Sequence, residues 1–261
     1  MQKFSLAVAK IEMFRQDESL VLGATGTGFF YKSDNETFLV TNWHNVTGVN
    51  PLTGKALHAQ GLLPNLIRVY YKQWADASKT VIRSQHLDMP LYCNDTPVWL
   101  EHSTRSNVDV VAIPLSLNNF ENFANEHINT VDQEMRLEVC AGMDCFILGF
   151  PEGMIGAGNT PIWKRGSIAS EPYQQHPYLV DSATRKGMSG APVIARHTGI
   201  FGKKTEVLDG SEIIGTVEKF VAIYSGRIGD DSLGYQLGRA WQSNVLEDIL
   251  SVKLRGKQPL Q

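Results

Sequence analysis

The stretch TRKGMSGAPV, residues 184–193, carries the strongest structural signal in this chain of 261 residues. Glycines at 187 and 190 flank Met188 and Ser189, so the backbone can form a tight loop in which successive N–H groups converge on one point. A loop of this kind exposes the Ser189 hydroxyl. The Pro192 and β-forming residues that follow predict that a strand begins directly after the loop.

Two further motifs precede this loop along the chain. In FLVTNWHNV, residues 38–46, a predicted strand delivers His44 to its end, where the imidazole can face a cleft while its backbone stays in the sheet. Taken alone, a histidine beside a tryptophan is more often a core residue.

In NVDVVAIP, residues 107–114, Asp109 interrupts an apolar run. A carboxylate there costs several kcal/mol unless it is paired, and a histidine N–H is a natural partner, although an aspartate at a strand start also caps turns.

Composition narrows the classes of function. The formal charge of −3 gives no electrostatic reason to expect a nucleic-acid or membrane partner, and the apolar runs are too short to span a bilayer. Three cysteines form an odd set without zinc-ligand spacing, which favours reduced thiols. Alternating apolar residues at Phe4, Leu6 and Val8 predict a strand and not a secretory signal, so the expected location is cytoplasmic.

Short apolar runs separated by turn residues predict an all-β protein with little helix. Residues 116–134 are polar and are interpreted as a linker between two lobes. Apolar residues at 245, 246, 249 and 250 share one face and predict a closing helix, with Asn244 or Ser243 as its cap and a fraying tail after residue 252. The predicted strands are 27–32, 37–42, 66–71, 79–84, 98–102, 108–115, 138–140, 145–150, 162–169, 178–181, 192–195, 220–225 and 233–241.

Taken together, TNWH at 41–44, DVVAI at 109–113 and GMSGAP at 187–192 resemble the three motifs of the trypsin-like (chymotrypsin-fold) serine peptidases, and most closely the stand-alone bacterial members without secretion signals. The resemblance runs from about residue 25 to 250, and the loops between 50 and 95 match nothing in the family. It implies two six-stranded antiparallel β-barrels and a short C-terminal α-helix. The implied organisation is an N-terminal barrel in 1–116, a linker in 117–136, a C-terminal barrel in 137–242, and the helix and tail in 243–261.

The resemblance also implies a chemistry, the hydrolysis of peptide bonds in a protein or peptide substrate through an acyl-enzyme. Ser189 would be the nucleophile, His44 the general base and Asp109 the group that orients the imidazole. The N–H groups of Gly187 and Ser189 would form the oxyanion hole. No cofactor or metal is expected. Met188 stands where zymogen-activated members have an aspartate that pairs with a freed N-terminus, which predicts a loop that orders without N-terminal cleavage.

The substrate pocket is less well specified by the sequence. The resemblance puts Ala183 and Thr184 at its floor, and Ala183 supplies no carboxylate, which argues against a preference for Lys or Arg and favours a small or medium apolar side chain. Charged residues on a nearby loop, Arg227, Asp230 and Asp231, could reach the pocket and reverse that preference, or be solvated at the loop tip. The predicted wall of the pocket is formed by Ile223, Tyr224, Ser225 and Gly226.

Three other functions stay open at this point. The chain could be a catalytically silent peptide-binding module with the protease fold, or a protease that is inactive until a regulatory partner orders its loops. An esterase or lipase of another fold is disfavoured, because that class needs Gly-x-Ser-x-Gly and the order Ser, Asp, His, whereas Ala191 replaces the second glycine and the order here is reversed.

Overall fold

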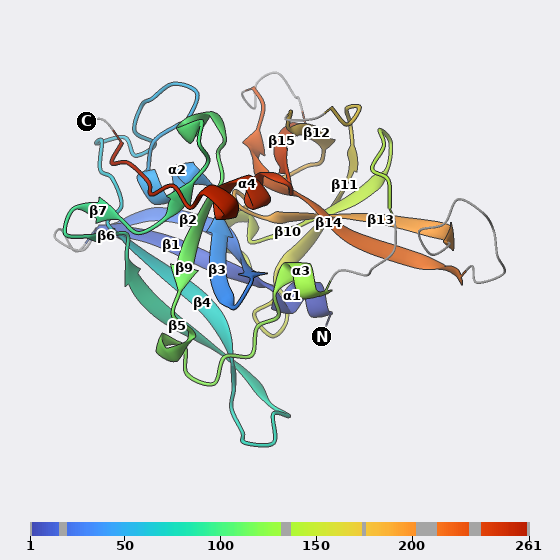
Figure 1. Ribbon diagram of the computed structural model, residues 1–261, viewed down its shortest axis with the longest axis horizontal. Helices are drawn as coiled ribbons and strands as arrows, with labels where there is room; N and C mark the ends of the chain where they lie inside the picture. Colours follow the sequence, from blue (N-terminus) through green and yellow to red (C-terminus); the bar gives the residue numbers. More distant parts are fainter. Residues whose placement is uncertain are drawn as a thin grey trace.

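The computed structural model describes residues 2–15, 20–131, 137–173, 176–201, 213–229 and 236–259. The expected all-β fold is confirmed: two sheets lie side by side, each built from one part of the chain (Figure 1). No helix in these described ranges is both long enough and apolar enough to cross a lipid bilayer.

The first sheet is antiparallel and has seven strands in the order β5-β4-β1-β2-β3-β9-β8. It has one strand more than expected, because the two-residue strand β8 extends the β9 edge. A small hairpin of β6 and β7 lies beside it. The strands are β1 (Val8–Arg15), β2 (Leu20–Ser33), β3 (Glu36–Thr41), β4 (Leu66–Trp74), β5 (Ile82–Pro90), β6 (Tyr92–Cys93), β7 (Thr96–Pro97), β8 (Leu100–Glu101) and β9 (Val111–Leu115).

The second sheet is a closed six-stranded barrel, in which every strand is paired on both sides. The β13–β14 hairpin continues well beyond it (Figure 1). The strand predicted at 233–241 begins at Leu237 as β15, and residues 233–235 lie outside the described part. The strands are β10 (Asp144–Gly149), β11 (Ile162–Ile168), β12 (Tyr178–Asp181), β13 (Pro192–Phe201), β14 (Ile213–Arg227) and β15 (Leu237–Gln242).

The closing helix α4 (Val245–Val252) joins the two lobes. It follows β15 of the barrel and packs on β8 and β9 of the first sheet. Its four predicted apolar residues are buried in a core that also contains Phe29 of β2 and Phe220 of β14, whose rings meet edge to face with centroids 5.2 Å apart. The predicted side-chain cap is wrong, because Asn244 has a helical backbone and makes no capping hydrogen bond.

The ends of the chain differ from the prediction. The strand expected at the N-terminus begins only at Val8, because residues 3–6 form the helix α1 (Lys3–Leu6). The predicted fraying of the tail is also wrong within the described residues, since Gly256 N–H donates to Trp99 O (3.0 Å) and Arg255 bridges to Leu100. Backbone pairing to β8 therefore anchors this polar segment.

Several internal strands also differ from their predicted positions. Residues 138–140 form no strand, the strand predicted at 79–84 becomes β5, and the strand predicted at 98–102 shrinks to β8. The linker packs against the first sheet, because Trp74 N–H donates to Asn122 O and Ala124 N–H donates to Lys72 O, both at 2.8 Å. Residues 132–136 of the predicted linker lie outside the described part. The remaining helical segments are η2 (Arg105–Asn107), η3 (Leu117–Asn119), α3 (Ile128–Val131) and η4 (Pro151–Gly153).

Candidate active site

His44 and Asp109 come together at one end of the first sheet. β3 and β9 are paired, so the residues that follow Thr41 lie beside those that precede Val111. His44 lies in the short helix α2 (Trp43–Thr47), so the expectation that its backbone stays in the sheet is wrong. The His44 ring Nδ1 is 2.7 Å from Asp109 Oδ2, and the His44 backbone N–H donates to Asp109 Oδ1 at 2.9 Å.

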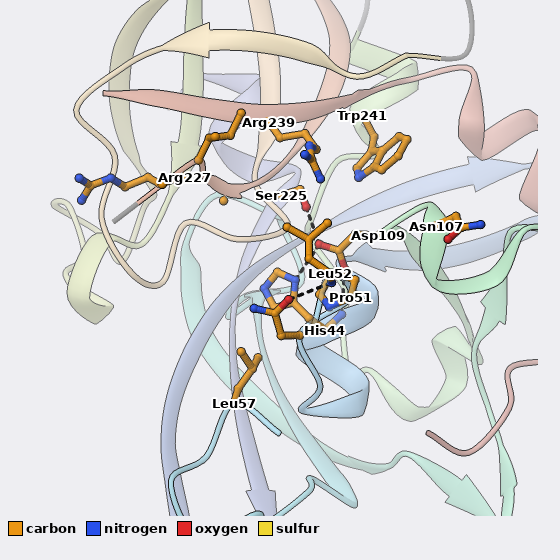
Figure 2. A pocket seen from close by; sticks show the side chains of 14 residues that line it. His44, Pro51, Leu52, Leu57, Asn107, Asp109, Ser225, Arg227, Arg239 and Trp241 are labelled. Carbon is orange, nitrogen blue, oxygen red and sulfur yellow. Dashed lines mark hydrogen bonds and ion pairs between the residues drawn. The ribbon is translucent and has the colours of Figure 1, made fainter. Parts of the chain in front are cut away.

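Asp109 is almost fully buried, with 2% of the residue's surface exposed. Besides the two contacts from His44, it accepts a hydrogen bond from Ser225 Oγ on β14 of the other lobe (Figure 2). The Asn42 side-chain amide donates to the Asp109 backbone oxygen at 2.6 Å. The three contacts to the carboxylate, from the His44 ring, the His44 backbone N–H and Ser225 Oγ, compensate its charge, and Asn42 fixes the Asp109 backbone.

The loop that carries Ser189 is held across the lobe boundary by uncharged hydrogen bonds. The backbone N–H of Thr27 on β2 donates to Ser189 O at 2.9 Å, and the Asn45 side-chain amide donates to the same oxygen at 3.1 Å. Thr27 Oγ1 donates to Gly187 O at 2.8 Å. Within the second lobe, Glu152 N–H donates to Lys186 O at 2.7 Å.

Both glycines of the loop are required by its geometry. Gly187 has φ +89°, and a Cβ there would lie 2.3 Å from Phe150 O. Gly190 has φ +87°, and a Cβ there would lie 2.1 Å from Thr27 O. Met188 between them is fully buried in the core of the barrel. The apolar Met188 side chain therefore anchors the loop in the core of the barrel.

The hydroxyl and the imidazole face the same cavity. His44, Gly187 and Ser189 line a cavity of about 570 Å³ between the lobes. Among the described residues, no acceptor binds the backbone N–H of Gly187 or Ser189, and no hydrogen bond joins the His44 ring to Ser189 Oγ. The site thus offers two N–H donors without a described acceptor beside a hydroxyl, in a cavity that an imidazole also lines.

The residues predicted to form the pocket are placed differently from one another. Thr184 is fully buried and its hydroxyl is bonded to the Tyr224 hydroxyl. The Tyr224 ring fills this space so closely that a Cβ at Gly238 would lie 2.4 Å from it. Burial raises the pKa of Tyr224 to about 12, so its phenol stays protonated. The structure thus places the Tyr224 phenol against Thr184, one of the two residues predicted to form the floor of the pocket.

The residues predicted to form the wall of the substrate pocket lie in different surroundings. Ile223 is fully buried in the core between the lobes, so its assignment to the pocket wall is wrong. Ser225 donates its hydroxyl hydrogen bond to Asp109 and also lines a second cavity beside His44. Gly226 lines the same cavity, and a Cβ there would lie 4.0 Å from Ser189 Oγ. Asp230 and Asp231 lie outside the described residues.

Sequence reasoning missed three positioning residues, namely Thr27, Asn42 and Asn45. Asn42 and Asn45 flank the quoted histidine motif, so two amides so close to a histidine were an available signal. Thr27 lies between glycines in a strand, which indicates a close backbone approach. Thr27 bonds Phe150, Gly187 and Ser189 of the second lobe and Thr41 of β3, and no local pattern identifies these partners. No cluster of His, Cys, Asp and Glu that could hold a metal ion occurs among the residues that the structure describes.

Comparison with known proteins places this geometry in a fold. No protein-family model and no curated protein matches the sequence. Among solved structures, a protease named Anisep from Arthrobacter nicotinovorans aligns over 94% of each chain with a TM-score of 0.51 and 12% identity. The chain has the fold of the trypsin-like serine proteases.

A second chymotrypsin-fold neighbour is the HtrA-type protease AlgW, solved with a tripeptide. It aligns over 95% of this chain with a TM-score of 0.50 and 14% identity, and this chain spans about 60% of its length. At such identities the likeness extends to the fold and no further. The chemistry of this chain depends on its own residues at the site.

Proposed function

We propose that this protein is a serine endopeptidase that hydrolyses peptide bonds through an acyl-enzyme, with His44, Asp109 and Ser189 as its catalytic residues. One observation carries the proposal. A histidine whose Nδ1 is bonded to a buried carboxylate shares a cavity with a serine hydroxyl that has two unbonded backbone N–H groups beside it. Each group has the chemistry that acyl transfer requires at that position.

The roles follow from the hydrogen bonds. Asp109 accepts the Nδ1 proton of His44, which leaves Nε2 as the basic nitrogen. Ser189 Oγ attacks the substrate carbonyl carbon while Nε2 takes the hydroxyl proton. The carbonyl oxygen becomes negative and accepts hydrogen bonds from Gly187 N–H and Ser189 N–H. Collapse expels the amine, which takes the proton from His44, and water then hydrolyses the ester with His44 again acting as base.

The experiment is covalent labelling with a fluorophosphonate probe, together with cleavage of unfolded casein. Wild-type protein should label and cleave, and Ser189→Ala should lose both, with activity falling by roughly 10⁴-fold or more. Ser251→Ala is the matched control, because that hydroxyl is exposed on α4 and bonds only Asp248 O. A folded wild-type protein that neither labels nor cleaves would contradict the proposal.

A second candidate function, a protease that is inactive until a partner or substrate orders its site, has one observation in its favour. The His44 ring and Ser189 Oγ, both described, are not hydrogen-bonded to each other, which fits a protease completed only when a substrate or partner orders the site. In that case the labelling rate should rise when a bound peptide or partner is added. A silent binding module would bind peptides without labelling under any condition.

A further inference from the structure

A second cavity borders the same imidazole. It has a volume of about 350 Å³ and lies between the loop at 50–57 and the β14–β15 edge of the barrel (Figure 2). His44, Asp109 and the strongly exposed Leu52 all line it. The cavity is therefore open to a chain that passes over the catalytic histidine.

The charges around this cavity are unequal. Arg227 and Arg239 line it, and Asp109 is its only carboxylate among the described residues. Asp109 is already engaged by the His44 ring, the His44 backbone N–H and the Ser225 hydroxyl. Within the described residues the charge left without a partner is that of the Arg239 guanidinium, so the cavity attracts an anion.

Arg239 lacks a partner that other arginines of this protein have. Its side chain is half-buried on β15, and within the described part of the chain its guanidinium makes no hydrogen bond and no ion pair. By contrast, four described arginines each pair with a carboxylate, at Arg68–Asp88, Arg105–Glu101, Arg165–Asp144 and Arg196–Glu218. A half-buried arginine gains most from a planar anion that accepts two of its hydrogen bonds.

A neighbouring donor is also unpartnered. Trp241 lines the cavity, and its buried Nε1–H has no acceptor among the described residues. In Figure 2 the Arg239 guanidinium extends toward Ser225, the Trp241 ring nitrogen lies on the same side, and Arg227 extends away. Two donors without an acceptor among the described residues, two positions apart on β15, thus lie on the same face of the strand and beside Asp109.

The distance to the reacting bond is short. Gly226 pairs with Arg239 in the β14–β15 register, and a Cβ at Gly226 would lie 4.0 Å from Ser189 Oγ. One strand spacing plus this separation puts the Arg239 backbone on the order of 10 Å from the hydroxyl, which is about three extended residues. Because Gly226 has no side chain, it leaves the space between Arg239 and the Ser189 hydroxyl open.

We propose that this cavity is a specificity subsite, in which Arg239 binds the carboxylate of an acidic substrate residue within about three positions of the bond that is cut. The inference rests on the proposed function, which it deepens by naming the substrate class. Arg239 is a binding residue in it and takes no part in proton transfer. Trp241 supplies a further donor on the same wall.

The test is a position-scanned fluorogenic peptide library in which each position carries either Glu or its uncharged isostere Gln. Wild-type protein should prefer Glu at one position by about 10-fold in kcat/KM. Arg239→Gln should abolish that preference, and Arg239→Lys should keep part of it. Arg165→Gln is the control, because this exposed arginine of the same barrel pairs with Asp144 and should leave the preference unchanged. Added salt should weaken the preference.

A binding measurement separates this inference from the proposed function. The same Glu and Gln peptides are titrated against full-length Ser189→Ala by fluorescence anisotropy. Tighter binding of the Glu peptide that depends on Arg239 supports the subsite even if wild-type protein never cleaves. Equal affinity for both peptides, or a preference that survives Arg239→Gln in a folded variant, overturns it. The variant should fold at least as stably as wild type, because it removes an unpaired half-buried charge.

Discussion

The two lobes hold their halves of the candidate site by different physical means. The first lobe presents an ionisable pair, and the buried Asp109 carboxylate is surrounded by donors from α2 and β14. The second lobe presents an uncharged loop whose carbonyls at residues 186–189 accept hydrogen bonds, while the N–H groups of Gly187 and Ser189 have no acceptor among the described residues. The first half is thus organised around a charge that is already present. The second is organised for a charge that would arise only during the reaction.

This difference predicts two kinds of failure. A change at the charged pair should alter protonation and leave the backbone in place. A change at the loop should move the N–H groups and leave the imidazole in place. Three variants, taken from the largest expected effect to the smallest, test this contrast.

Asp109→Asn tests the charged half. The amide can present N–H to the ring and favour the wrong histidine tautomer, so kcat/KM should fall by about 10⁴-fold at neutral pH while the circular dichroism spectrum is retained. Asp144→Asn is the control, since that carboxylate is exposed and pairs with Arg165 on the surface. Loss of less than 10-fold would remove Asp109 from the catalytic set.

Thr27→Val tests the uncharged half. It removes the hydroxyl that donates to Gly187 O and accepts from Phe150 N–H, at similar side-chain volume. The loop should lose its register, with kcat down by roughly 30-fold and KM little changed, because the free N–H groups would act mainly in the transition state. Thr198→Val, in an exposed pair with Thr216 on the barrel hairpin, should have no effect. A change in KM alone would contradict the role assigned to Thr27.

Lys72→Met tests the tether between the two halves. Lys72 on β4 donates from its buried ammonium to Gly158 O and Asn159 O, each at 2.8 Å, in the segment that follows Glu152 of the second lobe. Burial lowers the pKa of Lys72 from 10.5 to about 8. Between these values the unfolded chain holds a proton that the folded chain has lost, so folding stability gains from rising pH.

We therefore expect the difference in the free energy of unfolding between the two proteins to change with pH. From pH 8 to 10.5, wild-type protein should gain stability relative to Lys72→Met by at most about 1.4 kcal/mol per pH unit, and below pH 8 the difference should be constant. Urea unfolding at several pH values measures it. Lys219→Met, on β14, is the control for the loss of a lysine side chain. If the free energy of unfolding changed with pH in the same way for wild type and Lys72→Met, the lowered pKa of Lys72 would be contradicted.

Several elements of the site could be predicted because their information is local. The glycines at 187 and 190 follow from the turn that they must form, and the structure confirms their positive φ angles. The charge at Asp109 demanded a partner, and the structure supplies one in His44. Apolar alternation located most strands, although it failed at residues 138–140 and misplaced the start of β5.

Other elements depended on contacts between distant segments. Ser225 was assigned to a pocket wall, and its bond to Asp109 spans 116 residues. The pocket predicted beside Thr184 is occupied by the Tyr224 ring, because packing volume across a barrel is not encoded in a motif. Arg239 carried no motif at all, and only the described fold puts an unpartnered guanidinium beside His44.

The sequence by itself determined the all-β class, the order of the three motifs and the neutral residue before Ser189, because strand alternation, turn glycines and buried polar groups are local physical constraints. The tertiary structure alone decided which donors surround Asp109, which N–H groups stay free and what fills each cavity. Those properties arise where the two lobes meet, and hydrogen-bond geometry and packing there depend on residues more than a hundred positions apart.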